Sequence, residues 1–166
     1  MLHLVRHPLR LAYLLLGLWA AAHAPKGEST FSGKVVRVSD GDTIKVESQG
    51  VTYTVRLAAI DAPETAQPHG EDARRALSTR VLDKRVEVRQ IARDRYRRAI
   101  AFVECDKINV NLRMVEDGHA WHYDAYDDDP AFEAAEKKAK QDRLGLWKAA
   151  SPKAPWDYRR EKRRRR

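Results

Sequence analysis

The sequence predicts an α+β protein that is mainly β, with five short strands and three helices in one domain. Three β-type segments come first, a helical segment follows, and then come two more β-type segments and two helical ones. Strands that follow one another in this way can pair with their neighbours and close into a small barrel without exposed edges. At 166 residues the chain is long enough to bury a core of its own.

The five predicted strands are rich in Val, Ile, Thr and Tyr and cover residues 33–40, 42–48, 52–60, 85–91 and 98–105. Turn residues separate the first three strands at Asp40-Gly41 and Gln49-Gly50. After the third strand, DAPETAQPHG has two prolines and a glycine and predicts a loop. The charged segment ARDRYR joins the last two strands.

The three predicted helices have apolar residues at helical spacing and cover residues 71–81, 108–118 and 130–144. In the second helix, Ile108, Leu112 and Val115 are expected to share the buried face. Asp129 can cap the third helix, and Pro130 suits its first turn. A five-stranded barrel of the OB type, with a helix between the third and fourth strands, fits this order. Other small α+β sheets fit it too.

Residues 1–24 have the three-part form of an export signal. Arg6 and Arg10 precede an apolar run of about a dozen residues, and Ala22-His23-Ala24 is a small-x-small cleavage site. A membrane span needs roughly 20 apolar residues, so a signal peptide is favoured over an anchor. Pro25 lies just after the cut and disfavours cleavage there, so cleavage after Ala22 and retention as a membrane anchor stay open. We expect a secreted or periplasmic protein.

The excess positive charge lies at the two ends of the chain. Residues 25–158 hold equal numbers of acidic and basic residues, whereas 159–166 hold seven basic residues and one acid. We expect residues 25–31 to be a Pro/Gly/Ser linker and 149–166 to be a basic, disordered tail. Such a tail is attracted to phosphate or anionic surfaces, or it is a solvated tail without a specific partner.

Four carboxylates lie near predicted strand ends or turns: Asp40, Asp42, Asp61 and Glu64. The proline between Asp61 and Glu64 restricts the backbone, so these two side chains have a set separation. Paired carboxylates with water suit Ca²⁺ or Mg²⁺ rather than zinc. The alternative is that these acids only serve turns and loop caps.

Arginines near these acids could bind a phosphodiester. Arg56 lies five residues before Asp61, so on an ideal strand the two side chains face opposite sides, and a bulge or bend would be needed to unite them. Arg97 and Arg98 lie at the start of the fifth strand. Guanidinium groups can stabilise the negative charge that builds on phosphate oxygens during displacement. The alternative for each arginine is a surface ion pair.

The chain resembles the staphylococcal nuclease (thermonuclease) family from about Ser32 to Trp147. The blocks that carry the resemblance are VVRVSDGDTIKV, VRLAAIDAPE, DRYRRAIAFV, VNLRMVEDGHAW and RLGLW, in that order. The resemblance implies a nuclease domain over 32–148, folded as an OB-type five-stranded barrel with three helices.

The same resemblance implies roles for particular residues. Asp42, Asp61 and the backbone carbonyl of Ala62 would hold one Ca²⁺. Glu64 would be the general base or would orient the attacking water, and Arg56 and Arg98 would hold the scissile phosphate.

Three more residues are expected to contact substrate. Tyr96 would lie beside the nucleotide, as the resemblance implies, and Tyr126 is a candidate for stacking on a base. Arg97 stands where the family usually has glycine, so it either crowds the turn or adds a phosphate contact.

The implied activity is Ca²⁺-dependent hydrolysis of phosphodiester bonds, leaving 3′-phosphate ends. The implied substrates are single-stranded DNA, RNA and duplex DNA, cut without sequence reading because phosphate contacts carry no sequence information. We expect a monomer without a protein partner. The alternative is a non-catalytic OB-fold protein that binds nucleic acid, but a pure binding module has no reason to keep both metal carboxylates, Glu64 and both arginines.

Overall fold

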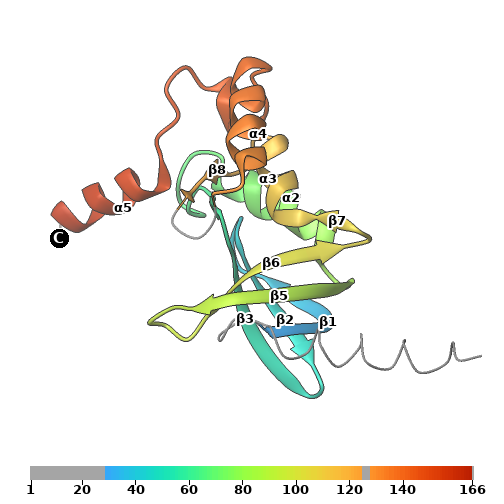
Figure 1. Cartoon of the computed structure of the whole chain (residues 1–166). Coiled ribbons are helices and arrows are strands. Elements are labelled where there is room, and N and C mark those ends of the chain that lie inside the picture. The colour runs from blue at the N-terminus through green and yellow to red at the C-terminus, as the bar shows by residue number, and fades with distance from the viewer. Residues whose placement is uncertain (1–28, 125–127, 166) are drawn as a thin grey trace, which may run out of the picture.

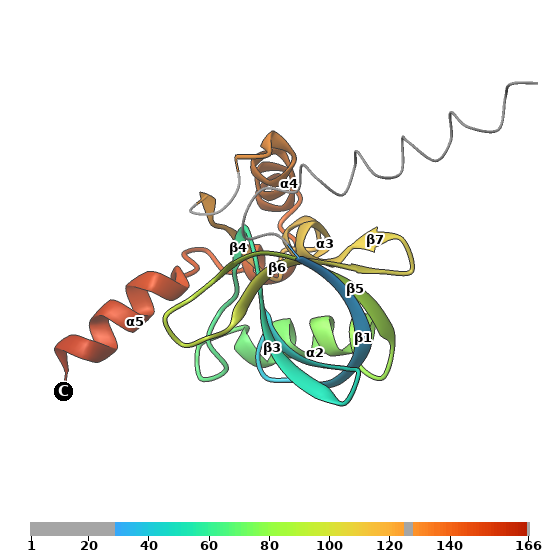
Figure 2. The ribbon, with the colours of Figure 1, turned by 60° about the horizontal axis from the view of Figure 1, so that its bottom comes forward.

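The computed structural model describes residues 29–124 and 128–165. Its main body is a closed barrel of five strands: β1 (Ser29–Val38), β2 (Thr43–Ser48), β3 (Val51–Leu57), β5 (Arg85–Arg93) and β6 (Ala99–Cys105). These strands lie in the order β3-β2-β1-β5-β6 and are antiparallel to their neighbours. A parallel pairing of β3 with β6 closes the ring, which Figure 2 shows. The predicted OB-type five-stranded barrel is confirmed.

Alternation of apolar and polar residues places the core inside this barrel. Val35, Ile44, Val55 and Val88 each lie on a different strand and are fully buried. Their β-branched side chains fit a pleated, half-buried surface well, so local preference and burial agree here.

Strand β1 begins earlier than the sequence predicted. Ser29 to Lys34 pair with Gln90 to Arg85 of β5, so the last residues of the expected 25–31 linker belong to the sheet. The ring of Phe31 packs 4.6 Å from that of Tyr53, which gives the extension an apolar contact. The prediction of a linker is therefore wrong for residues 29–31, and residues 1–24 lie outside the described part of the chain.

The described part of the chain contains four α-helices and one 3-10 helix: α2 (Gly70–Val81), α3 (Val110–Glu116), α4 (Pro130–Gln141), η2 (Gly145–Lys148) and α5 (Pro155–Arg164). Helix α2 lies across one end of the barrel (Figure 2), where Ala73, Leu77 and Val81 join the core. Helix α4 starts as predicted, because the Asp129 carboxylate accepts a hydrogen bond from the amide of Ala131. None of the described helices is long and apolar enough to cross a membrane.

The predicted buried face of the second helix is wrong in part. Ile108 is exposed and belongs to the short strand β7 (Ile108–Asn109), which pairs with β6. Helix α3 therefore starts two residues later than expected, with Asn109 as its N-cap. The residues that it buries are Val110, Asn111, Met114 and Val115.

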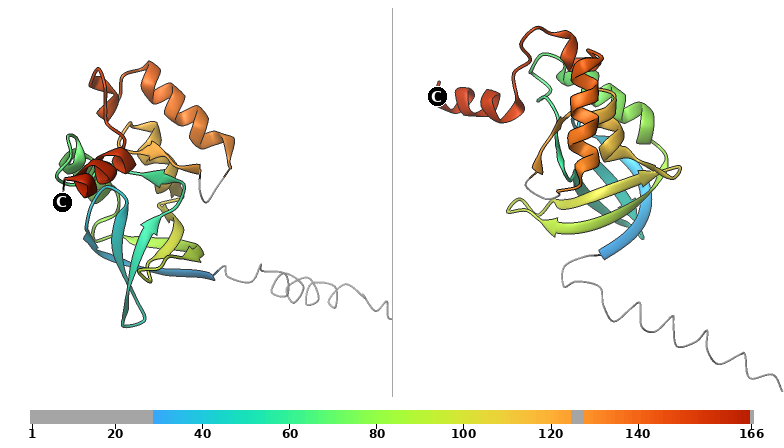
Figure 3. Two further views of the ribbon diagram at one scale, coloured as in Figure 1. Left: turned by 90° about the vertical axis from the view of Figure 1, so that its left-hand side faces the viewer. Right: turned by 45° about the horizontal axis from the view of Figure 1, so that its top comes forward.

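The C-terminal segment is ordered where a disordered tail was expected. Helix α5 extends from the barrel and helices, as Figures 1 and 3 show. Ala154 and Pro155 are buried at its start, and the Trp156 ring packs against Trp121 at 5.7 Å between ring centres. An acidic first turn and a basic last turn also suit the helix dipole. The predicted count of three helices therefore becomes four in the described residues.

Candidate active site

Asp42 is fixed by the turn between β1 and β2. Its amide donates to the Asp40 carboxylate at 3.1 Å, which is a local side-chain turn. Asp42 is buried, and its side chain accepts a hydrogen bond from the amide of Ala62 at 2.8 Å. Glycine is needed between the two acids because a Cβ at Gly41 would lie 2.6 Å from the Cβ of Ala62. The turn and the loop that follows Asp61 are thus packed directly on each other.

A bend at the end of β3 brings Arg56 and Asp61 to the same site. Ala59 has a φ of 61°, a left-handed conformation that interrupts the pleat, and the strand resumes as β4 (Ile60–Asp61). β4 pairs with β8 (Trp121–His122), so Asp61 is held in a second, two-stranded sheet and is 2% exposed. The bend that the predicted site required is therefore present.

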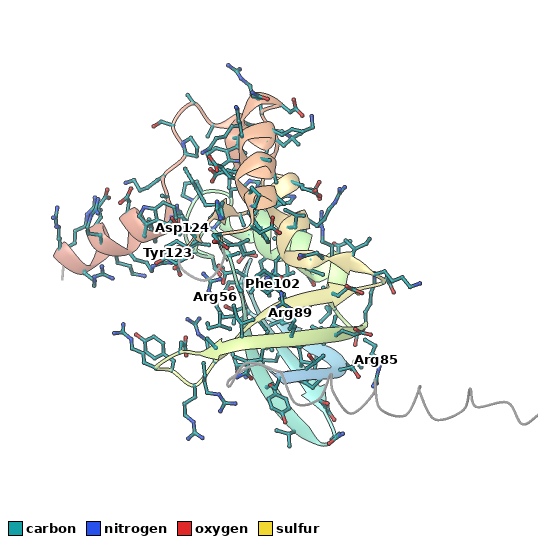
Figure 4. All side chains as sticks on the ribbon, viewed as in Figure 1. Arg56, Arg85, Arg89, Phe102, Tyr123 and Asp124 are labelled. Atoms are coloured by element: carbon teal, nitrogen blue, oxygen red, sulfur yellow. The ribbon has the colours of Figure 1, made fainter. Side chains whose placement is uncertain are left out.

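Arg56 ties the two buried acids together. Its Nη2 donates to Asp61 Oδ1 at 2.9 Å, and its Nε lies 3.2 Å from Asp42 Oδ1. Its Nη1 donates to the backbone carbonyls of Leu57 and Ile60 at 2.8 and 2.9 Å. Figure 4 shows Arg56 at the upper end of the barrel, below the segment that carries Tyr123. A guanidinium with this many fixed acceptors is rigidly oriented.

Glu64 lies at the same cleft on a structured loop. The amide of Glu64 donates to the side-chain oxygen of Gln67 at 3.2 Å, and the amide of Gln67 donates to the carbonyl of Glu64 at 2.8 Å. A Cβ at Gly70 would lie 1.9 Å from this carbonyl, so only glycine lets α2 start so close to the loop. Gln67 was not predicted, and a buried glutamine has no local sequence signal that distinguishes it from a loop residue.

The loop between β5 and β6 supplies the cationic side of the cleft. Asp94 orients it: its Oδ2 accepts from Arg98 Nε at 2.7 Å, and its Oδ1 accepts from the amides of Tyr96 and Arg98, both at 2.9 Å. Burial alone would raise the pKa of Asp94, but these hydrogen bonds from Arg98 and Tyr96 lower it overall. Tyr96 is 66% exposed, with the Arg98 guanidinium 5.8 Å from its ring centre.

Arg97 has a φ of 66°, which explains why glycine is usual at this position of the family that the chain resembles. A residue with a Cβ costs about 1 kcal/mol in this conformation. Arg97 does not line the cleft, whereas Arg95 and Arg98 do. Among the loop arginines, the structure therefore favours Arg98 over Arg97 as the one that reaches substrate.

Replacing Arg97 with glycine is expected to stabilise the protein by about 1 kcal/mol, because the left-handed strain is relieved. Urea unfolding followed by circular dichroism would measure the change. Arg95→Gly is the matched control, since Arg95 is also an exposed loop arginine but is not among the residues with positive φ. An unchanged midpoint for Arg97→Gly would contradict the explanation.

The predicted residues converge on one cavity of about 340 Å³. Its lining comprises Asp40, Asp42, Arg56, Asp61, Ala62, Pro63, Glu64, Arg95, Tyr96, Arg98, Arg159 and Arg163. The sequence prediction placed seven of these residues at the site by name. Tyr126 lies outside the described residues.

Arg159 of α5 is the largest addition to the predicted site. Its Nη2 donates to Asp61 Oδ2 at 2.7 Å, and its Nη1 donates to Glu64 Oε1 at 2.8 Å and to Asp61 Oδ1 at 3.2 Å. In the sequence it is one of many basic residues at the C-terminus, and composition gave no reason to single it out.

Negative charge is concentrated on the other side of the cleft. Burial, with the adjacent charge of Asp42, raises the pKa of Asp40 to about 7. Burial also raises the pKa of Asp61, although the hydrogen bond from Arg159 opposes this. Carboxylates that are costly to ionise without a counter-charge are favourable places for a cation.

The donor set fits a hard, oxygen-ligated cation. Asp42 and Asp61 present carboxylate oxygens that are close enough for one guanidinium to contact both. Residues 29–124 and 128–165 contain no group of three or more His, Cys, Asp or Glu side chains arranged for a metal. An ion at Asp42 and Asp61 would therefore complete its shell with water or a backbone carbonyl such as that of Ala62, as Ca²⁺ and Mg²⁺ commonly do.

The fold and cleft define an OB-type barrel protein in which buried carboxylates and fixed arginines face one another, an arrangement suited to a phosphodiester. Residues 54–149 match the family model described as staphylococcal nuclease homologue. The chain belongs to the staphylococcal nuclease family, and this membership supports a hydrolytic nuclease that acts on nucleic acid.

Relatives agree with this assignment. A protein of Haemophilus influenzae named "Uncharacterized endonuclease" is 40% identical over 129 residues, which are 77% of this chain and 72% of that protein. "Micrococcal nuclease" of Shigella flexneri is 39% identical over 141 residues, covering 78% of this chain and 81% of the relative. The rice protein "Probable staphylococcal-like nuclease CAN1" is 44% identical over 111 residues, 67% of this chain. The match spans only 34% of the rice protein's length.

Proposed function

We propose that the protein is a Ca²⁺-dependent nuclease that hydrolyses phosphodiester bonds of DNA and RNA and leaves 3′-phosphate ends. The observation that carries the proposal is the bridging of Asp42 and Asp61 by Arg56, with Glu64 at the same cleft. This arrangement supports a cation at the two buried carboxylates and a phosphate beside the guanidinium.

The residues of the cleft divide the chemistry among them. Asp42, Asp61 and the carbonyl of Ala62 would hold one Ca²⁺, which when bound polarises the phosphate and positions water. Glu64 takes the proton of the attacking water or orients that water. Arg56 and Arg98 donate hydrogen bonds to the phosphate oxygens, where negative charge builds in the transition state.

The cleft is suited to many nucleic-acid sequences. Its polar lining consists mainly of acids and arginines, which contact cations and phosphates and carry no base code. Exposed Tyr96 offers a ring on which any base can stack. Single-stranded DNA, RNA and duplex DNA are therefore proposed as substrates, and the enzyme is proposed to act as a monomer.

We further propose that the protein is exported, on the basis of the signal-like residues 1–24. Mass spectrometry of the protein recovered from the producing cells and their medium would test this. An N-terminus near residue 23 or 25 outside the cytoplasm supports export, and an intact N-terminus in the cytoplasm alone contradicts it.

The test of the function is cleavage of a labelled single-stranded DNA in Ca²⁺ and in a chelator. Glu64→Gln is expected to lower the rate at least about 100-fold, because general-base assistance is lost. Glu116→Gln is the matched control, since Glu116 lies away from the cleft and pairs at the surface with Arg113 on α3. Tight binding without cutting by the folded wild type would instead support a non-catalytic binding protein.

A further inference from the structure

Helix α5 carries an arginine into the active site. Arg159 uses both oxygens of Asp61 and one of Glu64, at distances of 2.7 to 3.2 Å. Asp61 is the buried acid proposed to hold the cation, and Glu64 is the proposed base. Arg159 therefore binds the carboxylate oxygens that the cation and the attacking water would need during catalysis.

The start of α5 is anchored to the body of the protein, and these contacts determine where Arg159 lies. Trp156 packs against both Trp121 and Tyr123, at 5.7 and 6.0 Å between ring centres. The side-chain amide of Gln67 donates to the carbonyl of Lys153, which links the Glu64 loop to the segment that precedes α5. The helix thus meets the loop that carries Glu64.

The two active-site arginines differ in how easily they can move. The Arg56 side chain is 15% exposed and is held by two backbone carbonyls. The Arg159 side chain is 39% exposed, and its hydrogen bonds within residues 29–124 and 128–165 go to Asp61 and Glu64. A divalent cation at Asp61 would compete with Arg159 for the Asp61 carboxylate while leaving the carbonyl anchors of Arg56 intact.

We propose that Arg159 is a further substrate-binding residue, which exchanges the carboxylates of the cation-free site for the phosphate backbone of bound nucleic acid. A guanidinium displaced from Asp61 would remain at the cleft that Arg98 and Arg163 also line. There the planar fork of Arg159 can bind phosphate oxygens in pairs. This inference rests on the proposed Ca²⁺-dependent function.

The first measurement is Ca²⁺ binding to the full chain by calorimetry, without nucleic acid. Arg159→Gln is expected to bind Ca²⁺ about tenfold more tightly than wild type, because a competing ligand of Asp61 is gone. Arg159→Lys keeps the charge but loses the fork, and is expected to show a smaller gain. Arg160→Gln is the matched control, because Arg160 lies next to Arg159, pairs with Asp157 of its own helix and is not a residue of the cleft.

The second measurement is steady-state cleavage of single-stranded DNA in saturating Ca²⁺. Arg159→Gln is expected to raise KM about fivefold with little change in kcat, since a phosphate contact made in both ground and transition states is lost. Arg160→Gln is expected to change KM less than twofold. Circular dichroism of each variant would show that it is folded.

Tighter Ca²⁺ binding together with a raised KM supports the exchange. Equal Ca²⁺ affinity in wild type and Arg159→Gln overturns it and leaves the nuclease proposal intact. Tighter Ca²⁺ binding with an unchanged KM also overturns it, because Arg159 would then only block the cation. If neither wild type nor the variants bind Ca²⁺, the proposed function fails together with the inference.

Discussion

Arg56→Ala is expected to lower the cleavage rate by about 10³-fold, because the variant loses a fixed donor to the phosphate oxygens where charge develops. It is also expected to destabilise the cation-free protein by about 3 kcal/mol, because two buried carboxylates lose their shared counter-charge. Asp42 and Asp61 have side chains only 8% and 3% exposed, so water replaces little of this interaction. The stability loss should shrink when Ca²⁺ is added, since the proposed ion would bind the folded state at the same acids.

Cleavage assays and urea unfolding, each with and without Ca²⁺, would measure the two effects. Arg56→Lys separates charge from geometry, because lysine keeps the positive charge but cannot bridge both acids as a planar fork does. Arg113→Ala is the control for losing an arginine, since that side chain is half exposed and, within the described part of the chain, pairs with neighbours on or just after α3. If Arg56→Ala is as stable as wild type without Ca²⁺, other groups must compensate the charges of the two acids.

The strands could be predicted because their signal is local. Val, Ile and Thr alternate with polar residues in β2, β3 and β5, and β6 is an almost continuous apolar run. The closure of the barrel has no local signal. It depends on a parallel pairing of Val55 to Leu57 with Ala99 to Ala101, between segments far apart in the chain.

The position of Arg56 shows where residue spacing fails. On an ideal strand, side chains alternate between the two faces, so Arg56 would lie on the face away from Asp61. The turn at Ala58 and Ala59 interrupts this alternation and brings both side chains to one site. Glycine or asparagine would have marked a left-handed turn, but alanine at position 59 gives no such signal. The resemblance to the family suggested the pair correctly, whereas the strand pattern alone did not.

Arg159 shows the limit of composition. The C-terminal run of basic residues predicts attraction to polyanions or a solvated tail, and either prediction gives every arginine the same weight. Ala154-Pro155-Trp156 was the missed signal: proline suits the first turn of a helix, and a large apolar residue beside it can dock that helix. Tertiary contact then decides which arginine reaches the cleft.

Asn111→Ala is expected to destabilise the protein by about 3 kcal/mol, because the buried amide of Val103 and carbonyl of Ala58 lose this partner, whereas the carbonyl of Ala101 still accepts from the amide of Ala58. The side chain is fully buried: its Oδ1 accepts from the amide of Val103 at 2.9 Å. Its Nδ2 donates to the carbonyls of Ala58 and Ala101 at 2.9 and 3.0 Å. One asparagine thus joins α3 to β6 and to the turn at Ala58 that orients Asp61 toward Arg56.

This link gives Asn111→Ala a second expected effect that a plain cavity would not produce. Because Ala58 lies in the turn before β4, loosening it should misplace Asp61 and weaken Ca²⁺ binding even under conditions where the variant is folded. Met114→Ala is the matched control, since Met114 is equally buried on the same helix but is apolar. Loss of stability in both variants, with weaker Ca²⁺ binding only in Asn111→Ala, would establish the asparagine as a positioning residue. Equal Ca²⁺ affinity in the two folded variants would mean that Asn111 only stabilises the barrel. The orientation of the Asp61 side chain would then depend on the pairing of β4 with β8.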